Sequence, residues 1–148
     1  MQHSGPVNAS SEAARQPWVV GISGASGTPY AAAVINGLLD AGEAVDLVVS
    51  KSARLTILDE TGLAWRDAHW REDLAVLLGR DISSADVAIW AHGDFAAGPS
   101  SGSYPAKGMV VVPASTAAVA GIAMGLSKDL LQRSADVTMK ERRPLVVC

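Results

Sequence analysis

The sequence is poor in several residue types, and each shortage excludes a class of protein. Its 148 residues include one cysteine, Cys148, so an internal disulfide is excluded and a reducing compartment is expected. Charged residues make up 18%, the formal net charge is −3, and no basic cluster could follow a nucleic-acid backbone. No apolar run approaches the roughly 20 residues that span a bilayer. We therefore expect a cytoplasmic protein with no membrane span and no nucleic-acid partner.

The length suits one domain with a substantial core rather than two. Residues 1–17 are polar and contain no apolar segment of the kind found in secretory signals, so we expect them to form a disordered leader. Residues 18–148 are then the folded domain.

Apolar runs alternate with helical patterns along that domain. Since strands that alternate with helices form parallel sheets covered on both faces, the sequence predicts a doubly wound α/β fold with about five strands. The strands are expected at 18–22, 44–49, 86–90, 108–113 and 145–147, and the helices at 30–39, 51–61, a short segment from about Trp70, 117–124 and 128–142.

The stretch from Trp18 to Tyr30 organises the rest of the chain. An apolar run, Trp18–Ile22, leads into the small residues 24–27, and Pro29 suits the first turn of the helix that follows. Such a strand, turn and helix direct unpaired N–H groups and the positive end of the helix dipole toward an anion. We expect a phosphate-bearing ligand near Ser26; the alternative is a tight structural turn.

Small hydroxyl residues follow three of the predicted strands. They are Ser26, Ser50, and Ser115 with Thr116. Ser50 is expected to cap the second helix, and Ser115 or Thr116 the helix at 117–124. Because ligands of such sheets gather at the carboxyl ends of the strands, three converging loops predict a binding site.

The last predicted helix carries a cationic face. Arg133 and Lys140 are seven residues apart, which returns them to nearly the same angular position, and Asp136 lies where it could pair with either. Periodicity alone leaves two interpretations open: a solvated, salt-bridged face and a substrate site. The region 92–107 before the fourth strand reads as a long loop rich in glycine, serine and proline, which is typical of functional or disordered segments.

Taken together, these residues resemble the flavin prenyltransferase family, the UbiX-type members of the flavodoxin-like flavoproteins. The matching segments are 23–27 (Ser-Gly-Ala-Ser-Gly), 49–53 (Val-Ser-Lys-Ser-Ala), 101–103 (Ser-Gly-Ser), 109–116 and 130–145. Their order and spacing cover nearly all of residues 18–148, and the last block is the most specific.

The resemblance implies an enzyme that binds FMN and transfers a dimethylallyl group from dimethylallyl monophosphate to the reduced flavin. The prenylated FMN would serve as a cofactor for UbiD-type decarboxylases. No metal is implied, and relatives form large homo-oligomers with sites at subunit interfaces. Where the family pattern has a cysteine before the Ser-Thr pair, this chain has Ala114.

The resemblance also implies roles for individual residues. Glu60 matches an acidic residue near the reacting centre, and Arg133 and Lys140 match basic residues that face the donor phosphate. Cations fixed there would stabilise the charge that gathers on a departing phosphate. The residues implied to hold FMN are Gly24, Ala25, Ser26, Ser50, Ser115, Thr116, Ala117 and Ala118, and those implied to line the flavin and donor pocket are Ser101, Gly102 and Ser103.

Relatives continue beyond the last strand with a Pro-Arg-Glu segment, then a tyrosine and an arginine that bind the donor phosphate, and a final helix. We therefore expect a fragment of a longer protein, which on its own binds flavin poorly and catalyses little.

The sequence also bears on three other functions. A nicotinamide-dependent oxidoreductase is disfavoured because the second strand ends at Ser50 without an acidic residue, and because Tyr104 and Lys107 are three rather than four residues apart. A flavin-dependent cysteine decarboxylase would need a catalytic histidine, but His3, His69 and His92 lie outside the helices that flank the flavin loops. A non-catalytic flavin-binding module remains the main alternative.

Overall fold

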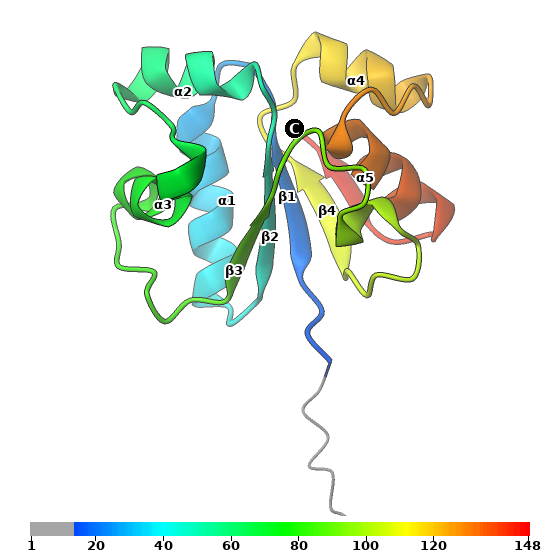
Figure 1. The fold of residues 1–148 in the computed structure, drawn as a ribbon, viewed down its shortest axis with the longest axis horizontal. Coiled ribbons are helices and arrows are strands. Elements are labelled where there is room, and N and C mark those ends of the chain that lie inside the picture. Colours follow the sequence, from blue (N-terminus) through cyan, green and yellow to red (C-terminus); the bar gives the residue numbers. More distant parts are fainter. Residues whose placement is uncertain (1–13) are drawn as a thin grey trace, which may run out of the picture.

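A five-stranded parallel sheet forms the centre of the molecule (Figure 1). The structure is a computed structural model, and it describes residues 14–148. The strands lie in the order β3-β2-β1-β4-β5. Their bounds are β1 (Trp18–Ile22), β2 (Val45–Val49), β3 (Val87–Trp90), β4 (Gly108–Val111) and β5 (Leu145–Val147). The predicted doubly wound α/β fold is confirmed.

Within residues 14–148, five α-helices cover the two faces of this sheet. One face carries α1 (Thr28–Asp40), α2 (Ala53–Thr61) and α3 (Trp70–Leu78), and the other carries α4 (Thr116–Ala123) and α5 (Leu130–Lys140) (Figure 1). Two short 3₁₀ turns, Asp67–His69 and Gly98–Ser100, lie in the connections. The second of these falls in the region predicted as a long loop.

Strand β1 lies at the centre of the sheet, with two strands on each side of it. After β1 the chain adds β2 and β3 on one side, and then crosses to add β4 and β5 on the other. In register, Val20 of β1 lies beside Leu47 of β2 and Val110 of β4. The loops after β1 and β4 therefore diverge at the carboxyl edge, which is where doubly wound sheets bind ligands.

Alternation along the strands divides the core in two. Val20 and Ile22 pack with Leu47 in the core under α1, α2 and α3, whereas Val19 packs with Met109 under α4 and α5. Successive side chains of a strand point to opposite faces, so a continuous apolar run such as residues 18–22 supplies both cores.

Most helix ends lie within a few residues of the prediction. Pro29 lies in the first turn of α1, and Ser115 caps α4 by accepting the Ala118 N–H at 3.0 Å. Helix α2 begins at Ala53, later than expected, although the Ser50 hydroxyl does accept the Ala53 N–H at 3.2 Å. Asp129, which the prediction overlooked, caps α5 by accepting the Gln132 N–H at 2.9 Å.

The expected leader falls largely outside the described residues, since the description starts at residue 14. Its last part lies against the sheet. The Arg15 guanidinium contacts Asp46 at 2.6 Å and Asp86 at 2.7 Å, and the Pro17 carbonyl accepts the Lys107 N–H at 2.8 Å.

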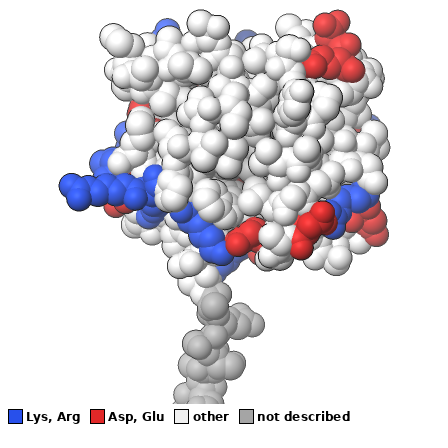
Figure 2. All heavy atoms as spheres, turned by 180° about the vertical axis from the view of Figure 1, so that it is seen from behind, with Lys and Arg blue, Asp and Glu red and all other residues white. Residues whose placement is uncertain are grey.

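The surface carries few charges on one broad side. Seen from behind, lysine, arginine, aspartate and glutamate gather toward the margins, and uncharged residues cover the middle (Figure 2). The edge strand β5 exposes Val146 and Val147. Within residues 14–148, no helix has both the length and the apolar character needed to cross a membrane.

Candidate functional site

The loops after β1 and β4 are joined by one buried hydroxyl. Ser23 Oγ donates to the Pro113 carbonyl at 2.6 Å and accepts the Ser115 N–H at 2.7 Å. Ser23 is 3% exposed, so these bonds are shielded from water. The two loops at the topological switch point are thereby held in one fixed relation.

The glycines of the first loop allow close packing. A Cβ atom at Gly24 would lie 2.6 Å from Ser52 Oγ. Only glycine at this position allows the loop after β1 to pack so closely against the start of α2. Gly27 has a φ of 124°, a backbone conformation that a larger residue rarely adopts. Ala25 lies between them and is partly buried.

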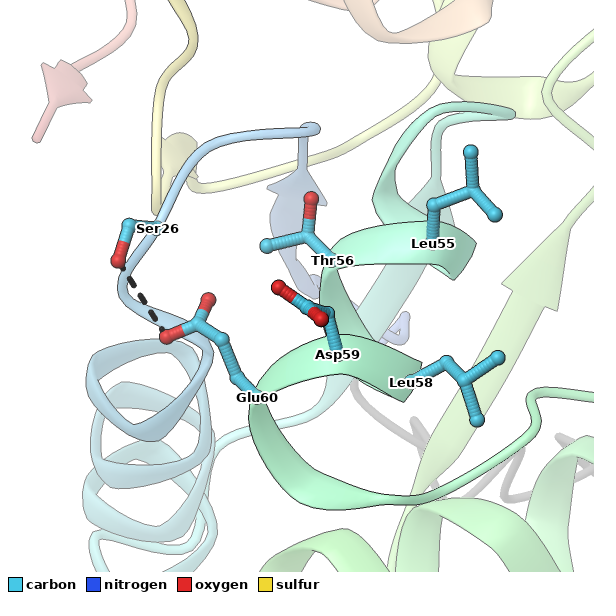
Figure 3. Close-up of a pocket in the computed structure, with 6 residues that line it drawn as sticks. All are labelled: Ser26, Leu55, Thr56, Leu58, Asp59 and Glu60. Atoms are coloured by element: carbon cyan, nitrogen blue, oxygen red, sulfur yellow. Dashed lines mark hydrogen bonds between the residues drawn. The ribbon is translucent and has the colours of Figure 1, made fainter.

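The N-terminus of α1 is occupied by the side chain of Glu60 (Figure 3). Its carboxylate accepts the Gly27 N–H at 3.0 Å and the Thr28 N–H at 3.4 Å, and it also accepts the hydroxyls of Thr28 at 3.2 Å and Ser26 at 3.4 Å. A carboxylate from α2 thus accepts from these donors in the structure, and a phosphate near Ser26 stays a prediction.

These hydrogen bonds also control the protonation of Glu60. Desolvation on its own would raise the pKa of Glu60, but the bonds from Gly27, Thr28 and Ser26 outweigh it and hold that pKa below its ordinary value. Glu60 is therefore a carboxylate at neutral pH.

An open cleft of about 510 Å³ lies beside Glu60. Thr56, Asp59 and Glu60 face its interior, while Leu55 and Leu58 point away from Ser26 on the outer side of α2 (Figure 3). Leu55 is 74% exposed and Leu58 is 45% exposed, so the cleft has an apolar margin open to solvent.

A second cavity, which we call the switch-point cavity, lies on the α4 and α5 side of the sheet and measures about 350 Å³. Hydroxyls and cations dominate its polar lining. Its walls are formed by Ser23, Ser50, Lys51, Ser52, His92, Ser115, Ala117, Ala118, Lys128, Asp129, Leu131 and Gln132.

The charges of the switch-point cavity favour an anion. Among residues 14–148, neither Lys51 nor Lys128 has a carboxylate within ion-pairing distance. The one acidic side chain in the lining, Asp129, accepts the Gln132 N–H as the cap of α5. Two unpaired ammonium groups beside several hydroxyls suit a phosphate and a polyhydroxylated chain.

A third group of predicted residues lies along α5. Arg133 Nε donates to the Ser100 carbonyl at 3.3 Å, and Arg143 donates to the Gly102 carbonyl at 2.9 Å. The segment 100–102 is therefore held against α5 and the residues that follow it. Lys140 lies 3.4 Å from Glu141.

The predicted pairing of Asp136 with Arg133 or Lys140 is wrong. Asp136 instead accepts the hydroxyl of Ser127, which has a φ of 47° in the turn before α5. The Ser127 hydroxyl comes from the turn before α5, so the Asp136 carboxylate is bonded from outside the helix and not by Arg133 or Lys140.

The structure thus divides the predicted residues among three places. Ser26 lies beside Glu60 at the N-terminus of α1. Segment 101–103 lies beside α5, near Arg133. Ser50, Ser115, Ala117 and Ala118 line the switch-point cavity. Gly24 packs against Ser52, and Thr116 is exposed as the first residue of α4.

Sequence reasoning missed several residues of the cavity. Lys51 directly follows Ser50, and His92 closely follows β3, so their places at strand ends were a usable signal. Lys128 and Gln132 offered no local signal, since they meet the cavity only through the packing of α5. Within residues 14–148, no group of three or more His, Cys, Asp or Glu side chains is arranged to hold a metal ion.

Comparison with protein families gives a match over most of the chain. A family model described as Flavoprotein matches residues 6–148. The flavin prenyltransferase UbiX of Streptomyces coelicolor is 67% identical over 140 residues, which cover 88% of this chain and 65% of that protein. The chain therefore spans somewhat less than two thirds of the length of this curated relative.

Solved structures show the same arrangement. The structure of AnUbiX in complex with FMN and dimethylallyl pyrophosphate is 37% identical, with a TM-score of 0.74, and the match covers 90% of this chain and 63% of that one. A dodecameric FMN-dependent UbiX-like decarboxylase from Escherichia coli O157:H7 is 36% identical, also with a TM-score of 0.74, over 89% of this chain and 65% of that one.

Proposed function

Because this chain belongs to the Flavoprotein family, we propose that it binds FMN and contributes the flavin site of a flavin prenyltransferase. The observation that carries the proposal is the 67% identity with a flavin prenyltransferase along nearly the whole domain. The transferred group would be dimethylallyl, and the product would be prenylated FMN for a UbiD-type decarboxylase in the cytoplasm.

The FMN phosphate is assigned to the switch-point cavity. At the N-terminus of α1 a phosphate would have to displace the Glu60 carboxylate from four donors. In the switch-point cavity, Lys51 and Lys128 are unpaired within the described chain, and the hydroxyls of Ser50, Ser52 and Ser115 lie beside them. Positive charge and hydroxyl donors fit a phosphate with its ribityl chain.

The chemistry that FMN supplies when bound is a reduced isoalloxazine that accepts the prenyl group. The contribution of this chain near α1 is a carboxylate of fixed orientation. Since the pKa of Glu60 is held low, Glu60 is ionised at neutral pH and supplies a fixed negative charge beside α1 rather than a strong base.

The donor phosphate is assigned to the α5 face. Breaking the bond between the allyl carbon and the phosphate oxygen leaves charge on the phosphate, and cations already in place stabilise that charge. Arg133 Nε donates to Ser100, which leaves the end of its guanidinium for a ligand, and Lys140 lies about two turns further along the same helix. We propose dimethylallyl monophosphate as the donor and a homo-oligomer as the assembled form.

A second candidate is FMN binding without transfer. It is favoured by one observation: Arg133, Lys140 and segment 101–103 are not among the residues that line the switch-point cavity. In that case the α5 face would be structural, and the cavity alone would be functional.

The test compares this chain with a chimera that continues into the remaining segment of the Streptomyces relative. Both are mixed with FMN, and binding is read from the visible flavin absorbance after gel filtration. Transfer is then measured with reduced FMN and either dimethylallyl monophosphate or the pyrophosphate. Binding with transfer by the chimera supports the proposal, binding without transfer by either form supports the second candidate, and absence of binding by folded protein contradicts both.

A further inference from the structure

We propose that Tyr104 is a positioning residue: through its hydrogen bond to the buried carboxylate of Asp46, it fixes segment 101–103 and, through that segment, Arg133. This inference rests on the proposed function, because it assigns the donor phosphate to the α5 face. It concerns a cluster around Asp46, the second residue of β2, which is not among the residues that line the switch-point cavity.

Asp46 is a charged residue in the interior of the sheet. It lies on β2 between β1 and β3, and it is 0% exposed. One carboxylate oxygen accepts the Trp90 indole N–H at 2.9 Å and the Tyr104 hydroxyl, and the other lies 2.6 Å from Arg15 Nη1. A buried carboxylate must keep such partners, so each donor is held firmly in place.

Tyr104 connects this carboxylate to segment 98–104. Its ring lies edge-on to Trp90, with centroids 6.1 Å apart, and a Cβ atom at Gly98 would approach the ring to 2.6 Å. The Tyr104 N–H donates to the Ser101 carbonyl at 3.2 Å. The segment between Gly98 and Tyr104 therefore folds around an aromatic ring that is anchored on the sheet.

The other side of the same segment is held by α5. Arg133 donates to Ser100 and Arg143 donates to Gly102, at 3.3 Å and 2.9 Å. The segment is thus clamped between the sheet and the helix. Releasing the Tyr104 anchor would let the Ser100 carbonyl move, and the Arg133 guanidinium would move with it.

Tyr104 acts in this arrangement as a neutral hydrogen-bond donor. Desolvation, followed by the hydrogen bond to Asp46, raises the pKa of Tyr104 to about 12, so the phenol remains a donor at neutral pH. The groups facing it are Asp46 and Arg15, whose guanidinium lies 3.3 Å from the phenol oxygen.

The chain offers a matched pair of variants. Tyr104→Phe and Trp90→Phe each remove one hydrogen bond to the same oxygen of Asp46, but only Tyr104 belongs to segment 98–104, which contacts α5. We expect both to lower the melting temperature, whereas only Tyr104→Phe should accelerate amide hydrogen exchange at Ser101 and Tyr104, by about 10-fold.

In the form that transfers the prenyl group, Tyr104→Phe should raise KM for the donor by about 3- to 10-fold and also lower kcat, because the displaced Arg133 is proposed both to bind the donor phosphate and to stabilise its charge as it departs. Trp90→Phe should leave both constants close to those of the parent. Gly98→Ala is a second variant, which displaces the Tyr104 ring without removing a partner of Asp46, and it should reproduce the rise in KM.

Equal exchange at segment 98–104 in the Tyr104 and Trp90 variants would overturn the inference, and so would faster exchange with an unchanged KM for the donor. If the parent itself transfers no prenyl group, the proposed function fails, whereas the exchange comparison still decides whether Tyr104 anchors the segment.

Discussion

The loop after β1 and the loop after β4 both lead into helices at the same edge of the sheet, yet they leave very different openings for an anion. At the N-terminus of α1, Glu60 accepts hydrogen bonds from Gly27, Thr28 and Ser26. At the α4 side, hydroxyls and two lysines surround a cavity of about 350 Å³. At the glycine-rich turn a carboxylate from α2 occupies the N-terminus of α1, whereas the serines after β2 and β4 border an open cavity.

The comparison separates two uses of small residues. Gly24 and Gly27 permit close packing and an unusual backbone angle, which bring α2 and its Glu60 within reach of α1. Ser50, Ser52 and Ser115 instead line the switch-point cavity, where the Ser50 and Ser115 hydroxyls also accept N–H groups at the starts of α2 and α4. A glycine-rich turn before a helix therefore indicates a possible anion position, but the charge of neighbouring elements decides whether a ligand or a side chain fills it.

The largest expected effect comes from reversing a charge in the open cavity. Lys128→Glu places a carboxylate near the proposed phosphate, which at close range costs about 2 kcal/mol and weakens FMN affinity about 30-fold. The control is Lys107→Glu, which makes the same change in net charge at a lysine paired with Glu43, at the other end of β4. Fluorescence titration with FMN measures both. Equal loss of affinity in the two variants would contradict the assignment of the phosphate to this cavity.

The second effect concerns the hydroxyl that joins the two loops. Ser23→Ala leaves the buried Pro113 carbonyl and Ser115 N–H without their shared partner, and it should lower the free energy of unfolding by about 1–3 kcal/mol. Urea denaturation gives the value. Ser103→Ala, at an exposed position, should change the free energy by less than about 0.5 kcal/mol. A loss no greater than that control would show that the loops are held together by other contacts.

The third effect tests the filled position directly. Since the pKa of Glu60 is lower in the folded chain than its ordinary 4.5, its carboxylate stabilises the fold above that value, and this contribution disappears as the pH falls through the lowered pKa. Glu60→Gln should therefore be less stable than the parent near neutral pH, and the difference should shrink as the solution is acidified. Thermal unfolding along a pH series measures this difference.

The neighbouring Asp59→Asn is the control for Glu60→Gln, since Asp59 lines the same cleft at a neighbouring position of α2. Near neutral pH it should unfold close to the parent, because Asp59 makes none of the hydrogen bonds that Glu60 accepts at α1. FMN affinity adds a decisive comparison. If Glu60→Gln bound FMN much more tightly than the parent, the carboxylate would be competing with the phosphate at α1, and the contrast between the two loops would be lost.

The sequence was sufficient for the architecture because its signals are local. Apolar runs predicted all five strands, and Pro29 and Ser115 marked the starts of α1 and α4. The hydroxyls at the strand ends were likewise visible, since parallel strands bring their carboxyl ends to one edge whatever the details of packing.

The charge balance of the site was not predictable in the same way. Glu60 reaches Gly27 across 33 positions of the chain, and Lys128 enters the cavity because of how the turn before α5 folds. The wrong pairing of Asp136 has the same origin: spacing along a helix shows which side chains are neighbours, but Ser127 reaches the carboxylate from outside the helix. Such contacts depend on tertiary packing.

The smallest expected effect comes from comparing one hydroxyl of each loop. Ser26→Ala removes an exposed bond to Glu60 of 3.4 Å, while the two backbone N–H groups and the Thr28 hydroxyl still hold the carboxylate; the change in unfolding free energy should stay below about 0.5 kcal/mol. Ser115→Ala removes the cap of α4 and should cost about 1 kcal/mol. FMN affinity should fall in Ser115→Ala and stay unchanged in Ser26→Ala. The reverse order in the FMN titration would place the phosphate at the glycine-rich turn, with Glu60 displaced from α1 when the ligand binds.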